Sequence, residues 1–245
     1  HPGTSIWSLI GLNSQLRALL DANIVFYLNS GTLNEIDESV VITDLGPYSQ
    51  ACTPTGVSHD TAVPLSGFGA TAIRFDSGDY LEVTNAAEMT SGIGTGAFTF
   101  EAWVRPTSTG TNRYICAFGT IAGTAYKSLG IYVNATQYPV AFLDSDGIVP
   151  FEVSMTSTIA LVINTWTHFA MVREAGGTTT MYVGGVPTGT PAASTADFAE
   201  FTGAFVIGEQ LTHTGSWVGQ MQSIRLSNTA RWTADFSASL PTAPY

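Results

Sequence analysis

The sequence predicts an all-β protein whose strands run antiparallel. Short runs rich in Val, Ile, Phe, Tyr and Thr recur from Ile24 onward, and clusters of Gly, Pro, Asn and Asp separate them. Their spacing of roughly 8–12 residues is typical of a β-sandwich or barrel, and no helical period lies between them as parallel βαβ units would require. With 245 residues, of which 44% are hydrophobic and only 11% are charged, the chain is suited to one large two-sheet sandwich.

The expected strands follow one another along the chain. The paired glycines Gly184 and Gly185 predict a two-residue hairpin turn, because type I′ turns need positive φ at both central residues. The segments expected to be extended are residues 23–28, 39–45, 47–57, 72–83, 96–106, 114–121, 127–134, 138–144, 151–158, 167–174, 179–185, 203–209 and 218–227.

The first residues have a different period. Leucines there follow one another at helical steps of three and four residues. We therefore expect residues 1–21 to form a short N-terminal helical arm, and residues 22–245 to form the sandwich domain. The arm either packs on its own domain or docks on a neighbouring subunit. These leucines are Leu9, Leu12, Leu16 and Leu19.

Alternation within residues 98–106 (FTFEAWVRP) predicts which side chains face the core. Phe100 and Val104 fall on one face, whereas Glu101 and Trp103 fall on the other. His168, on a later strand candidate, is expected to fill a polar niche in the core.

The charge balance excludes two classes of partner. The net charge is −11 with only 8 Lys and Arg, so the chain cannot assemble the basic stripe that binds nucleic acid or an anionic membrane. No apolar run approaches the ~20 residues that span a bilayer. Cys52 and Cys116 are expected to be either two buried thiols or one disulfide. Because the chain starts at His1 rather than Met, removal of an initiator or a longer leader stays open.

Four aspartates in turn sequences are candidate ligands for a hard cation such as calcium. Asp76 and Asp79 flank a Ser-Gly turn, and Asp144 and Asp146 lie in the stretch FLDSDGIVP. Aspartate is also favoured in turns because its carboxylate accepts hydrogen bonds from nearby backbone N–H groups. A structural corner is thus the main interpretation, with calcium as the alternative and no other cofactor expected.

Three aromatic residues in loops or turns are candidate contacts for a carbohydrate, because the apolar face of a sugar stacks on an aromatic ring. They are Tyr126, Tyr138 and Trp217. Catalysis has weaker support. Glu35 and Asp37 in EIDESV are the nearest approach to the spaced carboxylates of a retaining glycosidase, but Val40 stands where a third carboxylate would be needed.

Four segments resemble, in sequence order, the core pattern of laminin-G-like, concanavalin A-like jelly-roll domains. They are AIRFDSGDYLEV (72–83), FTFEAWVRP (98–106), NTWTHFAMVREAGGTTTMYVGG (164–185) and the closing stretch that ends in RLSNTARWTADF (225–236). The resemblance covers residues 22–245 and implies an antiparallel two-sheet jelly-roll. Gln222 and Ser223 replace an acidic residue that is frequent in the family's last strand, which removes one possible calcium ligand.

The ending RLSNTARWTADFSASLPTAPY (225–245) is similar to the close of such domains in virion proteins of tailed bacteriophages. This resemblance implies a non-enzymatic structural protein of the virion, in contact with other virion proteins and assembled as a homo-oligomer. Two roles fit it: a tail or fibre module that adheres to host surface glycans, and a decoration protein on the capsid surface. A secreted bacterial carbohydrate-binding lectin is the alternative, and a glycoside hydrolase is the third hypothesis.

Overall fold

The computed structural model describes most of the chain from Asn23 onward. The described residues are 23–28, 42, 44–84, 89–90, 92–122, 125–148, 151–201 and 203–244, without the side chains of residues 120–122, 125–127 and 200. The predicted helical arm at residues 1–21 lies outside the described residues, as do Glu35 and Asp37. Among the residues that are described, no helix is long and apolar enough to cross a membrane.

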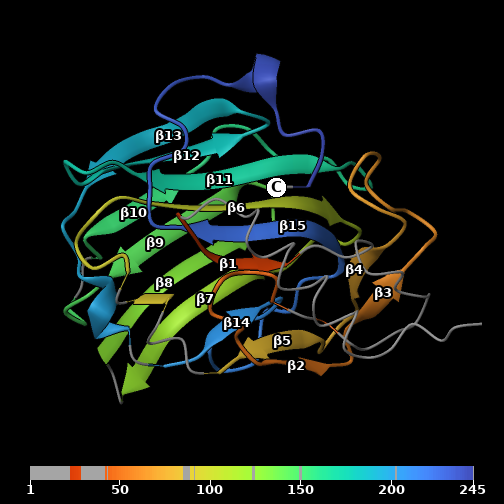
Figure 1. Ribbon diagram of the computed structural model, residues 1–245, viewed down its shortest axis with the longest axis horizontal. Helices are drawn as coiled ribbons and strands as arrows, with labels where there is room; N and C mark the ends of the chain where they lie inside the picture. Colours follow the sequence, from red (N-terminus) through yellow and green to blue (C-terminus); the bar gives the residue numbers. More distant parts are fainter. Residues whose placement is uncertain are drawn as a thin grey trace, which may run out of the picture.

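The strands form two antiparallel sheets that pack as a sandwich (Figure 1). The eight-stranded sheet contains, in spatial order, β13 (Val186–Ala193), β12 (Thr178–Val183), β11 (Thr167–Arg173), β6 (Phe98–Pro106), β15 (Gly219–Ser227), β4 (Ala72–Phe75) and β3 (Ser58–Asp60), with β1 (Ile24–Leu28) also paired to β15. The seven-stranded sheet contains β10 (Val153–Thr156), β9 (Pro139–Asp144), β8 (Ala125–Val133), β7 (Arg113–Ala122), β14 (Phe205–Ile207), β5 (Tyr80–Val83) and β2 (Cys52–Thr55). Two short 3₁₀ turns complete the fold, η1 (Phe198–Glu200) and η2 (Ser237–Ser239).

The all-β antiparallel prediction is confirmed, and the structure adds two strands that the sequence does not predict. Strand β13 carries Pro187 and Pro191, which argue against a strand, yet it lies at the edge of its sheet, where proline is tolerated. Strand β3 has only three residues. Of the predicted strand at residues 39–45, the described residues 42, 44 and 45 are not in a strand.

The core lies between the two sheets and follows the predicted alternation. Phe100 and Val104 of β6 are 1% and 0% exposed and pack in the main cluster with inward residues of the other sheet. The β12–β13 hairpin turns at Gly184 and Gly185, with φ of 59° and 78°, as predicted. Cys52 and Cys116 are free thiols, not a disulfide.

The outer face of the eight-stranded sheet holds a buried charge network centred on Glu101. This carboxylate accepts hydrogen bonds from Arg225 Nε of β15 at 2.9 Å and lies 3.1 Å from His168 Nε2 of β11. All three side chains are at most 3% exposed. Burial by itself raises the pKa of Glu101, but the bonds and charges of His168 and Arg225 outweigh it and hold the pKa at about 2.

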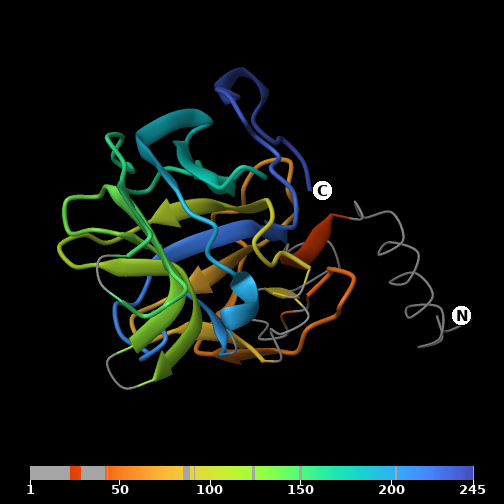
Figure 2. The same cartoon turned by 90° about the vertical axis from the view of Figure 1, so that its left-hand side faces the viewer.

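The C-terminal segment covers this face. Phe236 packs on Tyr182 and edge-on to the His168 ring, Trp232 stacks on Phe236 at 4.0 Å, and Phe236 N donates to Gly185 O. Figures 1 and 2 show this dark blue segment on the side of the molecule away from the green strands of the seven-stranded sheet. The C-terminal segment, which carries the resemblance to virion proteins, therefore packs on the outer face of the eight-stranded sheet.

Replacement of Glu101 by Gln tests this network. Because Arg225 would stay buried without its carboxylate, we expect Glu101→Gln to lower the free energy of unfolding at neutral pH by about 3–5 kcal/mol, measured by urea denaturation. The folded-state pKa of about 2 lies below the ordinary value of 4.5, so the unfolded chain binds the proton more readily. The contribution is therefore complete above pH 4.5 and is lost as the pH falls toward 2. Equal acid sensitivity in the variant and the wild type would contradict this assignment.

Candidate functional site

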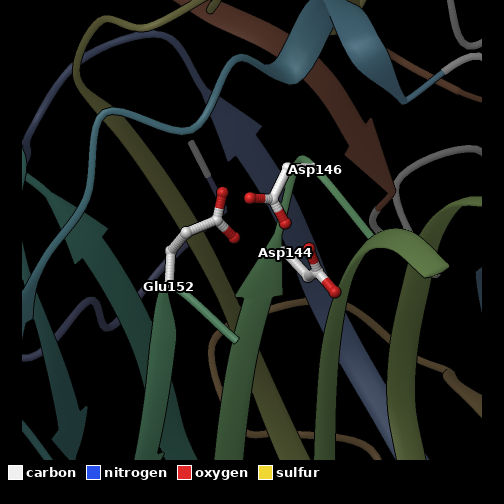
Figure 3. Close-up of side chains that lie close together, drawn as sticks. All are labelled: Asp144, Asp146 and Glu152. Carbon is white, nitrogen blue, oxygen red and sulfur yellow. The ribbon is translucent and has the colours of Figure 1, made fainter. Parts of the chain in front are cut away.

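Three carboxylates meet where β9 ends and β10 begins. Asp144 is the last residue of β9, Asp146 lies in the following turn, and Glu152 directly precedes β10 (Figure 3). One ligand oxygen from each lies within 4.8 Å of those of the other two. Since antiparallel neighbours bring their connected ends together, this turn gathers residues eight positions apart in the chain.

Each carboxylate also organises the turn itself. Asp144 accepts a hydrogen bond from Gly147 N at 2.7 Å, and Asp146 accepts one from Ile148 N at 2.8 Å. Glu152 accepts bonds from Ser145 N and from Ser145 Oγ, at 2.9 Å and 2.6 Å. An ionised carboxylate has about four lone-pair sites, so each of the three can accept further bonds.

The electrostatics of the cluster are unbalanced. Burial raises the pKa of Asp144, and the adjacent charges of Glu152 and Asp146 raise it further. Within the described part of the chain, no Lys, Arg or His forms an ion pair with any of the three carboxylates. A hard cation would relieve this repulsion, and oxygen ligands of this kind are the ones that calcium prefers.

A pocket of about 530 Å³ adjoins the cluster. Ser145 and Glu152 form one side, and Gly176 with residues 193–196 forms the other. The first side belongs to the seven-stranded sheet and the second to the ends of β11, β12 and β13, so the pocket lies where the two sheets meet at one rim of the sandwich. Small side chains form its walls, and the lining is about equally polar and apolar, with serine and threonine hydroxyls beside alanine and glycine.

The two other predicted aspartates lie in a different corner. Asp79 Oδ2 accepts a hydrogen bond from Asp76 N at 2.7 Å, Asp79 N donates to Asp76 O, and Asp76 pairs with Arg74 at 3.6 Å. Within the described residues, neither aspartate belongs to a group of three that could hold a metal. The turn thus has the structural geometry that the main interpretation predicted.

The predicted aromatic contacts do not converge on the pocket. Trp217 is 0% exposed and lies in the main core with Arg113 5.9 Å from its ring, so the prediction that it contacts a sugar is wrong. Tyr138 is half-buried after the turn capped by Asn134, and it does not line the pocket. The backbone of Tyr126 lies in β8, and its side chain is outside the described residues.

Glu152 is the site residue that the sequence did not reveal. Its position before a strand, six residues after Asp146, matches no calcium-loop motif. The signal that could have found it is the pair of neighbouring strand candidates, residues 138–144 and 151–158. If they form a hairpin, an acidic residue at the start of the second strand lies beside acidic residues at the end of the first.

The family model for the concanavalin A-like lectin/glucanases superfamily matches residues 75–235. The chain belongs to this superfamily. A search of curated proteins gives no significant match to the sequence.

Solved structures of bacterial toxins share the fold. The binding domain of Paraclostridial Mosquitocidal Protein 1 superposes with a TM-score of 0.62 at 15% identity, over 88% of this chain and 50% of that one. The binding domain of botulinum neurotoxin serotype C1 gives 0.63 at 11% identity, over 91% and 52%. The binding domain of botulinum neurotoxin DC in complex with SialylT gives 0.61 at 12% identity, over 89% and 50%. The chain spans about half the length of these domains, and the likeness is one of fold.

Proposed function

We propose that the protein is a non-catalytic, lectin-like module of a tailed-phage virion that binds a glycan of the host surface at the rim pocket. The observation that carries the proposal is the pocket itself. Small side chains, polar and apolar in about equal measure, form its walls beside three carboxylates, on a fold of the lectin/glucanase superfamily. Backbone groups and hydroxyls at fixed positions suit the many hydroxyl groups of a sugar.

The structural relatives support a glycan ligand. Cell entry of botulinum neurotoxin type C is dependent upon interaction with two ganglioside molecules, and the binding domain of botulinum neurotoxin DC forms a complex with SialylT. Because this chain matches only about half of those domains, we propose a glycan as the class of ligand and assign no binding residue from them.

A non-catalytic role agrees with the positions of the carboxylates. A glycosidase flanks the scissile bond of its substrate with a pair of carboxyl groups. Of Asp144, Asp146 and Glu152, only Glu152 lines the pocket.

The proposal includes a calcium ion bound beside the pocket. Asp144, Asp146 and Glu152 would hold the ion, which supplies the positive charge that the cluster lacks. Through its bonds to Ser145, Glu152 would then keep one wall of the pocket in place.

The virion role rests on the resemblance of residues 225–245 to the close of phage domains. In the fold, Phe236 of that segment packs edge-on to the His168 ring, and Trp232 stacks on Phe236. Contacts with other virion proteins and assembly as a homo-oligomer belong to the same proposal.

Calcium binding is testable with a matched pair of variants. We expect Glu152→Gln to weaken calcium binding by about tenfold or more, equivalent to ~1.4 kcal/mol, in isothermal titration calorimetry. Asp79→Ala is the control: it removes a turn hydrogen bond and should lower stability by about 0.5–2 kcal/mol without changing calcium affinity. Equal calcium affinity in the wild type and Glu152→Gln would remove calcium from the proposal.

Glycan binding is testable by filling the pocket. Ala193 is an exposed residue of its wall, so we expect Ala193→Trp to abolish binding to host glycans on an array. Ala70→Trp, at an exposed alanine that does not line the pocket, should leave binding intact. A protein that binds no glycan with or without calcium, or that releases products from a polysaccharide, would overturn the lectin-like function.

The place in the virion is tested by immunogold electron microscopy of phage particles from the source that encodes the chain. We expect label at the tail tip or fibres, as a glycan-binding module requires. Label over the head would instead favour capsid decoration. Particles without label would favour the secreted lectin.

A further inference from the structure

One wall of the rim pocket, residues 194–196, lies outside any helix or strand. It belongs to the short segment that connects β13 to η1, and it faces the side of the pocket formed by Ser145 and Glu152. Ser194 N donates to Gly177 O at 3.0 Å, and Ala196 N donates to Ser194 Oγ at 2.9 Å. Because no ladder of strand hydrogen bonds holds this wall, its position depends on such individual bonds.

The guanidinium of Arg173 holds the other end of the 194–196 wall. Arg173 is the last residue of β11 and is 0% exposed. Its Nη1 donates to Ala196 O at 2.6 Å, its Nε to Gly96 O at 2.8 Å and its Nη2 to Gly94 O at 2.9 Å. One side chain therefore ties the wall to the turn that precedes β6.

The charge of Arg173 makes these three bonds necessary. Burial lowers its pKa to about 10 and the nearby charge of Asp197 opposes this shift, so the group stays protonated at neutral pH. No carboxylate of a described residue lies within ion-pair distance of Arg173. A buried cation without a carboxylate needs other acceptors, and displacement of the Ala196 carbonyl would leave one of its donors without a partner.

Two aromatic rings fix the guanidinium itself. Its Cζ atom lies 5.1 Å from the ring centroid of Phe98 and 5.3 Å from that of Phe198, and these two rings pack with centroids 4.6 Å apart. Phe198 begins η1 two residues after Ala196, and its N–H donates to Gly94 O at 3.0 Å. The wall is thus anchored on both sides of the peptide group that Arg173 binds.

We propose that Arg173 is a positioning residue of the rim pocket, which fixes the 194–196 wall in the place that ligand binding requires. Arg173 does not itself line the pocket, so it acts through the carbonyl of Ala196. The consequence for affinity rests on the proposed glycan binding at this pocket, whereas the positioning of the wall does not.

Arg173→Lys tests the positioning without any ligand. Lysine keeps the positive charge but has one nitrogen, which cannot reach three carbonyls as the planar guanidinium does. We expect the hydrogen-bonded amides of Ser194, Ala196 and Phe198 to exchange at least about tenfold faster in this variant, the scale of one lost bond to a charged group. The amides of β15 serve as the reference for global opening of the fold.

Arg113→Lys is the matched control. Arg113 is 1% exposed, donates to Ser108 O and Gln137 Oε1, and does not line the pocket. Its replacement should leave the exchange of the wall amides, relative to β15, as in the wild type. Equal acceleration of these amides in both variants would show that the wall responds only to lost stability, and would overturn the positioning role.

The functional consequence is measured on an array with the glycans that the wild type binds. We expect Arg173→Lys to weaken binding by at least about tenfold, again the scale of one such bond, and Arg113→Lys to leave it unchanged. A loosened wall with unchanged glycan affinity would overturn the role of Arg173 in binding. A wild type that binds no glycan would overturn the proposed function, and amide exchange would still decide whether Arg173 positions the wall.

A measurement on the wild type needs no variant. Glycan bound in the pocket contacts the wall, so it should shift the NMR signal of the Arg173 Nε–H and leave that of the Arg113 Nε–H in place. An unshifted Arg173 signal at saturating glycan would contradict the coupling between this side chain and the pocket.

Discussion

The structure depends most on the buried carboxylate of Glu101. Strand β6 lies in the middle of the eight-stranded sheet, and Glu101 joins it through side chains to β11 at His168 and to β15 at Arg225. Arg231, 3.9 Å away, brings the first turn of the C-terminal segment to the same carboxylate. A charge removed from water is tolerated only when it is paired and hydrogen-bonded, so these strands and the covering segment stabilise one another.

This arrangement decides where binding can occur. The inner face of the eight-stranded sheet is filled by the core, and Phe236 with the C-terminal segment packs on its outer face at β11 and β12. The loops at the rim of the sandwich lie outside both packed surfaces. The pocket between Glu152 and residues 193–196 lies there, supported on both sides by strands whose register the core fixes.

The sequence predicts the fold where strands alternate clearly, and it fails where local chemistry is ambiguous. Strand β6 is predicted correctly because small or apolar residues recur at every second position from Phe98 to Val104. Strand β13 is not predicted because two prolines argue against a strand, although an edge strand tolerates them. Trp217 follows a glycine-containing loop, which predicts a surface residue, but the loop folds back and buries it. Glu152 joins its cluster through strand pairing, so it could be predicted only from the two strand candidates taken together and not from a calcium-loop motif.

The scarcity of cationic side chains gives the acidic sites their different properties. With 19 Asp and Glu against 8 Lys and Arg, the chain cannot pair each carboxylate with a cation, and Arg173 is committed to backbone oxygens of Gly94, Gly96 and Ala196. Glu101 pairs with Arg225, whose guanidinium stays positively charged, and such a pair suits a structural role. Among the described residues, the one possible cation within ion-pair distance of Glu209 is His213. In the described part of the chain, no cationic side chain pairs with the rim cluster at Asp144, and the proposed calcium ion would compensate this negative charge.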